Sequence, residues 1–189
     1  MGPEADIDAL LLAGDAKRAA EEGIRAYGPS VLGLLHRLLA RPELADDAFS
    51  LFAEQLWSSM ATFERRASMR TWCFRLARNA AITVQRESWQ RNRRRLATTE
   101  AERIADDVRT KSALRLERQS QVVTRLAKHF SLDEQTLLSL RIDQRMAWDE
   151  ISEVLSSPGE PVGSPALRKR FERLTEKLRD LARDEGLLE

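Results

Sequence analysis

SMRTWCFRLARNAA, residues 68–81, is the stretch of sequence that decides the fold class. Its apolar side chains recur at spacings of three and four, the period of an amphipathic α-helix. Together with Val84 they form one face: Met69, Trp72, Cys73, Leu76, Ala77 and Ala80. Ser68 suits the N-cap position, because its hydroxyl can accept a backbone N–H of the first turn. We therefore predict a helix in which the single cysteine is a core residue rather than a reactive one.

The opposite face of this predicted helix is basic. It carries Arg75, Arg78, Asn79, Ile82 and Arg86, and Trp89 continues it into QRNRRR at 90–95. Ten bases and one acid fall within residues 65–95, so the net charge of +1 conceals a concentrated basic ridge. A solvated helix face, the alternative interpretation, would mix acids among its bases. Arginine forms paired hydrogen bonds with phosphate and stacks on unpaired bases, so we predict a nucleic-acid partner.

The helical period continues along most of the chain, and alternating β-type patterns are absent. We predict an all-α protein with two small helical domains, at 1–96 and 113–189, joined by a polar linker at 97–112 that is partly helical. No apolar run approaches the roughly 20 residues needed to cross a bilayer. The amino terminus lacks a signal-peptide pattern. We therefore expect a cytoplasmic protein without membrane insertion.

The first predicted domain begins with two helices on either side of a break at Gly28-Pro29. A second break, at Arg41-Pro42, leads into LADDAFSLFAEQLWSSMATF, where Phe49, Phe52, Leu56 and Met60 share one face. Asp46 and Asp47 lie near the amino end of this helix, where the helix dipole favours acids. The two acids therefore have two possible explanations: they stabilise the start of the helix, or they form part of a binding site.

The second predicted domain has the plan of a helix-turn-helix. We expect a helix from about Ser112 to His129 and a capping box at SLDE, residues 131–134, before the helix TLLSLRI. MAWDEISEVL forms the next helix, and SSPGEPVG turns the chain. Ser164 and Pro165 suit the N-cap and first residue of a last helix whose early turns are basic. A basic second helix of this kind enters the major groove of DNA.

These segments together resemble a bacterial RNA polymerase sigma factor of the sigma-70 class, in the small extracytoplasmic-function group. RAYGPSVLGLLHRLLARPELADDAF is similar to the opening of sigma domain two, and FERRASMRTWCFRLARNAA to its loop and promoter-melting helix. AWDEISEVL with ALRKRFERLTEKLRDL resembles the domain-four helix-turn-helix. The resemblance implies promoter recognition, DNA melting and transcription initiation, with core RNA polymerase and promoter DNA as partners. An anti-sigma factor is a further candidate partner.

The resemblance also implies roles for individual residues. Contacts with the melted minus-ten strand fall on Arg65, Arg66, Trp72, Arg75, Arg78, Asn79 and Arg86. Contacts with minus-thirty-five duplex DNA fall on Ser164, Arg168, Lys169, Arg170 and Arg173. Contacts with the polymerase core fall on Asp46, Asp47 and Glu54.

Two departures from the family pattern stand out. Ser50 and Leu51 replace a Gln-Glu pair that usually grips the polymerase, so the usual core contacts are in question. One hypothesis is that phosphorylation of Ser50 restores the missing charge, adding about −1.5 to −2 units; an unmodified serine on a solvated helix is the alternative. The turn at 156–165 is also longer than the family's usual connection, which would change the angle of the last helix or host a partner contact.

An enzyme is not expected from this sequence. His36 and His129 lie far apart in helical segments, no Cys/His spacing suits a metal, and no glycine-rich loop precedes a lysine. We therefore expect neither a cofactor nor a metal. Two alternatives to a sigma factor remain: a dimeric helix-turn-helix regulator that binds duplex operators without polymerase, and a helical adaptor that binds only protein.

Overall fold

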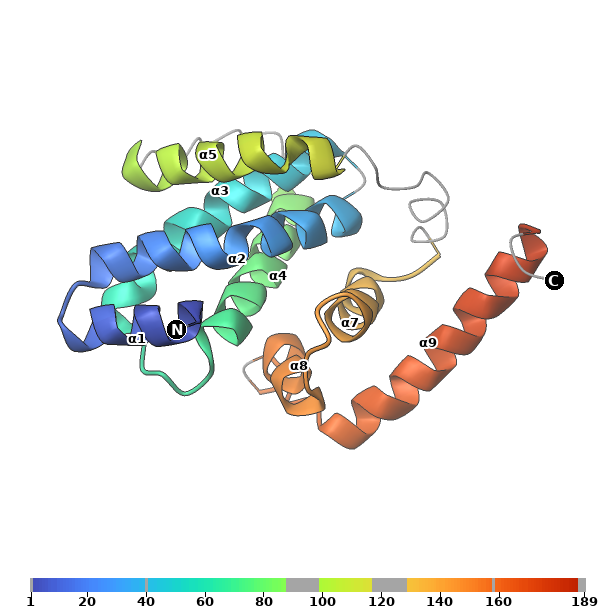
Figure 1. Ribbon diagram of the computed structural model, residues 1–189. Coiled ribbons are helices and arrows are strands. Elements are labelled where there is room, and N and C mark those ends of the chain that lie inside the picture. The colour runs from blue at the N-terminus through green and yellow to red at the C-terminus, as the bar shows by residue number, and fades with distance from the viewer. Residues whose placement is uncertain (1, 40, 88–98, 117–128, 158, 187–189) are drawn as a thin grey trace. The chain divides into compact units, whose positions relative to one another are not determined.

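The computed structural model describes residues 2–39, 41–87, 99–116, 129–157 and 159–186. Over these residues the protein is all-α, with eight α-helices and one short 3-10 helix, as the sequence predicted (Figure 1). It divides into two compact units, Met1–Arg118 and Gln119–Glu189. No helix in the described ranges is both long and apolar enough to cross a bilayer.

Unit 1 is a helical bundle built around α2. Its elements are α1 (Pro3–Leu12), α2 (Ala16–Leu38), α3 (Pro42–Ser59), the 3-10 helix η1 (Met60–Thr62), α4 (Met69–Glu87) and α5 (Thr99–Leu116). Helix α2 packs against α1, α3, α4 and α5, and α3 packs against α4 (Figure 1). Phe49, Phe52 and Phe74 are its largest fully buried side chains. The bundle therefore fixes α3, which carries the predicted polymerase residues, and α4, which carries the predicted minus-ten residues other than Arg65 and Arg66.

The break predicted at Gly28-Pro29 is wrong, because α2 continues through both residues. Gly28 marks a close approach between helices instead: a Cβ there would lie 3.2 Å from Val108 Cγ1 and 3.3 Å from Phe49 Cζ. The chain breaks earlier, after α1, where Gly14 has φ +76°, a left-handed conformation that glycine adopts without strain. Proline inside a helix normally costs about 3 kcal/mol, and the packing of α2 on four other helices offsets that cost.

The segment predicted as a linker at 97–112 differs most from the sequence-based expectation. Residues from Thr99 onward form α5, which packs along α2 and α3 and belongs to unit 1 (Figure 1). Its buried apolar side chains follow the helical period; they are Ala101, Ile104, Ala105 and Val108, and Ser112 is buried as well. This stripe is easily missed among the surrounding charges. The helix predicted from about Ser112 to His129 lies largely outside the described residues, and its first residues belong to α5.

Unit 2 contains α7 (Leu132–Ile142), α8 (Trp148–Leu155) and α9 (Ser164–Asp184), which pack against one another. The capping box predicted before α7 is confirmed: Glu134 N–H donates to Ser131 Oγ, and Ser131 N–H donates to the Glu134 carboxylate. The N-cap predicted for α9 is wrong by one residue. Gly163 occupies that position, and the Ser164 hydroxyl donates to Asp149 of α8 instead. The two helices of the predicted helix-turn-helix are thereby joined across the turn.

The long turn after α8 is held by hydrogen bonds to that helix. Ser152 Oγ donates to Val162 O at 2.6 Å, and Val162 N–H donates to Ser156 Oγ at 3.0 Å. An isolated bridge pairs Ser157 with Glu160. The described part of the turn is therefore anchored to α8 at both of its ends.

Candidate nucleic-acid interface

The start of α4 is fixed by two caps. Thr71 N–H donates to Ser68 Oγ at 3.1 Å, which confirms Ser68 as the predicted cap. The carboxylate of Glu4, from α1, accepts the Met69 N–H and also the Tyr27 hydroxyl. An acid at this position suits the positive end of the helix dipole. Helix α1 therefore holds the amino end of the basic helix in place.

The inner face of α4 is dense with small and aromatic side chains. Cys73, Ala77 and Ala80 are fully buried, as predicted, and so is Phe74, which the sequence analysis did not assign to the core. Burial raises the pKa of the Cys73 thiol well above its ordinary value, with a smaller contribution from the charge of Glu4. The thiol is therefore neutral and shielded, which confirms that Cys73 is a core residue.

An aromatic pair lies where α4 meets the preceding loop. The Phe63 and Trp72 rings are 5.9 Å apart between centroids and tilted by 37°. The Arg75 guanidinium lies 5.7 Å from the centroid of the Trp72 ring. The indole N–H of Trp72 has no acceptor within the described residues. The pair offers half-buried aromatic rings beside a cation, a combination that suits an unpaired base.

The loop between η1 and α4 presents two further arginines. Arg65 is exposed and has φ +54°, an uncommon backbone conformation for a residue with a side chain. Arg66 is also exposed, and its Nε lies 2.6 Å from the Glu64 carboxylate. Both side chains lie outside the core, two and three residues after Phe63.

Not all of the predicted basic face is exposed. Asn79 and Arg86 are open to solvent and Arg75 is half-buried, but Arg78 is only 6% exposed. The prediction that Arg78 lies on an open face is therefore wrong. Positions 74, 77, 78 and 81 are all buried, so α4 is enclosed over a wider arc than its apolar stripe indicates. Trp89 and residues 90–95 lie outside the described residues.

A second basic surface lies on α9. Arg168, Lys169 and Arg173 are exposed, and Arg170 is half-buried. Trp148 of α8 packs edge-on against Phe171, at 5.6 Å between centroids, with the Arg141 guanidinium 4.6 Å from its ring centroid. Buried Leu167 and Leu174 hold the inner side of α9. The aromatic contact orients α9 on α8 and leaves its first turns open.

The predicted polymerase residues on α3 lie in different surroundings. Asp47 is exposed, Asp46 and Glu54 are partly exposed, and Asp46 Oδ1 lies 3.7 Å from His36 Nε2. Burial lowers the pKa of His36, and the charge of Asp46 opposes that shift. Ser50 is half-buried beneath α5, where its hydroxyl donates to Glu102 and accepts from Arg109. Neither of these two α5 partners was predicted, because nothing in the local sequence pattern indicates a contact some 50 to 60 residues away along the chain.

The basic ridge and its bundle agree with a known family model. Residues 24–95 match sigma-70 region 2. The matched segment begins within α2, covers α3, η1 and α4, and contains every residue predicted for minus-ten and polymerase contacts. The match supports the role of an RNA polymerase sigma factor in promoter recognition and melting. Among curated proteins no match was found.

Helix α5 and all of unit 2 lie outside the region 2 match. Their assignments therefore rest on the sequence resemblance and on the geometry described above. The described residues contain no group of three or more His, Cys, Asp or Glu side chains placed to hold a metal.

Proposed function

We propose that the protein is a sigma factor of the extracytoplasmic-function group, which directs core RNA polymerase to promoters and melts the minus-ten element. The observation that carries the proposal is the coincidence of the region 2 match with the basic ridge of α4 and its loop. In this role the protein is a dissociable specificity subunit without catalytic groups of its own. It would act in the cytoplasm, with an anti-sigma factor as a candidate regulator.

The minus-ten surface would work by stacking and phosphate attraction. A base turned out of the duplex costs a few kcal/mol of lost pairing and stacking. Stacking on an aromatic side chain returns about 1–3 kcal/mol per base, and the pair formed by Phe63 and Trp72 would supply it. Arg65, Arg66 and Arg75 would attract the strand's phosphates, with Asn79 and Arg86 extending the track along α4.

Arg78 is the one predicted minus-ten residue whose surroundings argue against a direct contact. Its side chain is enclosed within unit 1, so reaching a phosphate would require the side chain to leave the bundle. We infer that Arg78 supports α4 from inside, and that the exposed residues on either side of it make the DNA contacts.

The basic turns of α9 would bind minus-thirty-five duplex DNA. Arg168, Lys169 and Arg173 are exposed early in the second helix of a helix-turn-helix, the part that enters the major groove in this motif. Arg170 is less open, and Ser164 already donates its hydroxyl to Asp149. We therefore expect the three exposed bases to contribute more to binding than Ser164.

Helix α3 would bind the polymerase core through Asp46, Asp47 and Glu54. Phosphorylation of Ser50 remains a hypothesis for strengthening that contact. Because Ser50 is hydrogen-bonded to α5, a kinase would reach the Ser50 hydroxyl only after α5 had moved away from it.

The experiment that tests the proposal is size-exclusion chromatography with purified bacterial core RNA polymerase, followed by run-off transcription from a library of candidate promoters. Co-elution together with promoter-specific transcripts supports a sigma factor. Binding of duplex DNA by the isolated protein, with no binding to the core enzyme, would instead favour a helix-turn-helix regulator. Arg41→Ala is a control for alanine substitutions in the basic ridge such as Arg75→Ala, because Arg41 is exposed at the start of α3 and lies outside that ridge.

A further inference from the structure

We propose that α5 is an intramolecular cover on the α2–α3 face, and that it must leave this face before core RNA polymerase can bind α3. The inference rests on the proposed function, which makes α3 the polymerase-binding helix. Figure 1 shows α5 lying along α2 and α3 within unit 1. The occupant of this face in the free protein is thus a segment of the same chain.

The apolar side of α5 fits closely onto the bundle. Ala101, Ile104, Ala105 and Val108 are all buried. Val108 approaches the backbone of α2 at Gly28, where a Cβ atom would lie only 3.2 Å from Val108 Cγ1. Helix α5 is therefore seated on the face rather than resting loosely above it.

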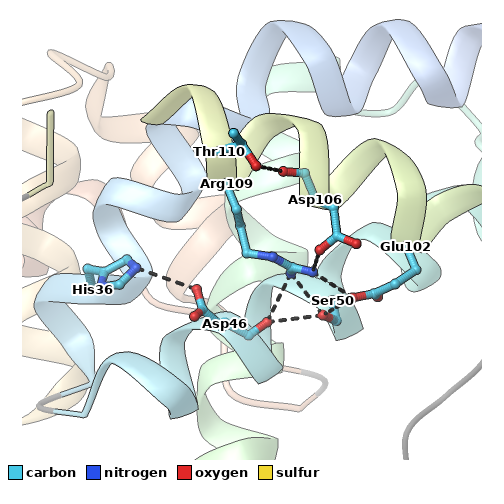
Figure 2. Close-up of polar contacts among 7 residues, drawn as sticks. All are labelled: His36, Asp46, Ser50, Glu102, Asp106, Arg109 and Thr110. Carbon is cyan, nitrogen blue, oxygen red and sulfur yellow. Dashed lines mark hydrogen bonds and ion pairs between the residues drawn. The ribbon is translucent and has the colours of Figure 1, made fainter. Parts of the chain in front are cut away.

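A polar cluster centred on Arg109 completes the contact. From α5, Arg109 reaches toward α3 and donates to Ser50 Oγ at 3.0 Å (Figure 2). The same guanidinium donates to Glu102 at 2.5 Å and to Asp106 at 2.6 Å, and it lies 5.8 Å from the centroid of the Phe49 ring. Ser50 Oγ in turn donates to Glu102 at 3.1 Å. We call this group, Ser50, Glu102, Asp106 and Arg109, the Arg109 latch.

The latch is partly shielded from water, which distinguishes it from an ordinary surface ion pair. Only 17% of the Arg109 side chain is exposed. Burial alone would lower the pKa of Arg109, but its hydrogen bonds and charge interactions with Asp106 and Glu102 raise it. The guanidinium therefore stays charged. Glu102 and Asp106 belong to α5 and move with it, so release of α5 costs Arg109 its hydrogen bond to Ser50, its contact with the Asp46 carbonyl and its place beside the Phe49 ring.

The rest of the α5 contact suits a cover that can be released. Its buried stripe has no aromatic anchor among residues 100–112, and three of its four members are alanine or valine. An ion pair that joins α5 to α2, between Asp107 and Arg25 at 2.9 Å, is well exposed, and exposed pairs contribute little. Docking of α5 thus depends on a small apolar area and one shielded latch.

On α3, α5 covers Ser50 and the Asp46 backbone, beside the carboxylates that the polymerase would contact, and leaves the Asp47 side chain exposed. Arg109 also contacts the Asp46 backbone carbonyl at 3.4 Å, so the latch extends over the turn that includes both Asp46 and Ser50 (Figure 2). A polymerase helix placed on this turn would occupy the volume of the Arg109 side chain. Binding of α5 and binding of the core enzyme are therefore mutually exclusive at this position.

Hydrogen–deuterium exchange of the full chain, free and bound to core RNA polymerase, tests the cover without any mutation. We expect amides of residues 100–112 to exchange at least about tenfold faster in the complex, while α3 becomes more protected. Unchanged or stronger protection of α5 in the complex would overturn the proposal. Failure of the protein to bind the core enzyme at all would instead remove the proposed function on which this inference rests.

Arg109→Ala gives an independent test, with Arg103→Ala as its matched control. Arg103 lies on the same helix but is 78% exposed and pairs only with Glu100 of α5 in the described contacts. We expect Arg109→Ala to speed exchange of α5 and to tighten core binding by about five- to tenfold, because the competing contact is weakened. Arg103→Ala should leave both unchanged. Faster α5 exchange with unchanged or weaker core binding would contradict the cover.

Discussion

Arg109 of α5 donates a hydrogen bond to the Ser50 hydroxyl of α3, with 3.0 Å between the two atoms. These residues are separated by 59 positions, and their contact joins Ser50, for which phosphorylation is one hypothesis, to the helix that we propose as a cover. Any modification of Ser50 would therefore also change how firmly α5 is held on α3.

A negative charge at Ser50 should release α5. Ser50→Asp removes the hydroxyl that donates to Glu102 and places a third carboxylate around one guanidinium. Arg109 is already paired with Glu102 and Asp106, so we expect the repulsion of the new carboxylate by these two to exceed its attraction to Arg109, and core binding to tighten by about fivefold. Binding titrations with core polymerase measure the effect.

Ser58→Asp serves as the control for that substitution. Ser58 is on the same helix but is exposed, and its hydroxyl donates only to Gln55 O in the described contacts. The charge hypothesis fails if the two aspartate variants bind the core enzyme equally well, or if Ser50→Asp binds no better than the unmodified protein.

Two glycines of α2 should respond in opposite directions to alanine. Gly33→Ala meets open space and should stabilise the helix by about 0.5–1 kcal/mol. Gly28→Ala gains the same helix propensity but crowds Val108 and Phe49, so we expect a net loss of about 1 kcal/mol or more. Urea unfolding of both variants gives the comparison. Equal stabilisation by the two would show that neither Val108 of α5 nor Phe49 of α3 packs closely against Gly28.

The buried thiol of Cys73 should make the protein less stable in alkali. Its pKa is raised in the folded state, so the stability it contributes is complete below the ordinary thiol pKa near 8.5 and declines as pH rises above it. The loss approaches about 1.4 kcal/mol per pH unit while the folded thiol stays protonated.

The measurement for this prediction is the free energy of unfolding between pH 8 and pH 10 for the protein and for Cys73→Ala. The variant should show the smaller decline, whatever its absolute stability. Tyr27, whose pKa is raised by burial and by its hydrogen bond to Glu4, contributes to the decline of both proteins. The smaller part of its shift that comes from the charge of Cys73 is lost in the variant, which also makes the decline of the variant smaller. Identical slopes would mean that the thiol is accessible in the folded protein.

Arg75 and Arg78 should separate DNA binding from stability. Arg75→Ala should lower binding of single-stranded minus-ten DNA by the polymerase complex about tenfold, with the free energy of unfolding changed by less than about 0.5 kcal/mol. Arg78→Ala should instead destabilise the protein by about 1–3 kcal/mol, because it removes a buried polar side chain. DNA-binding and urea-unfolding measurements on each variant distinguish the roles. A stable Arg78→Ala variant with a selective DNA defect would show that Arg78 contacts DNA after all.

The features that the sequence predicted well are local ones. The cap at Ser68, the capping box at Ser131 and Glu134, and the buried position of Cys73 each depend on residues within one helical turn or on one helical stripe. Such local patterns show which backbone N–H groups a capping side chain can bind and which face of a helix must be buried, without knowledge of any tertiary contact.

The features that it missed depend on contacts between distant segments. Gly28-Pro29 indicates a break locally, but packing against α5 and α3 makes the glycine a contact site within a continuous helix. Arg78 lies in a basic run, yet the bundle encloses it. Helix α5 has too small an apolar stripe to be distinguished from a linker until α2 and α3 are placed beside it.

The most direct test of the central claim is permanganate detection of unpaired thymines at a minus-ten element, on a promoter selected from the transcription library. We predict that thymines react only when the protein and core RNA polymerase are both present, and that Arg75→Ala reduces the signal while Arg41→Ala does not. A duplex that the protein binds alone, and that stays closed when the core enzyme is added, would contradict the assignment as a sigma factor.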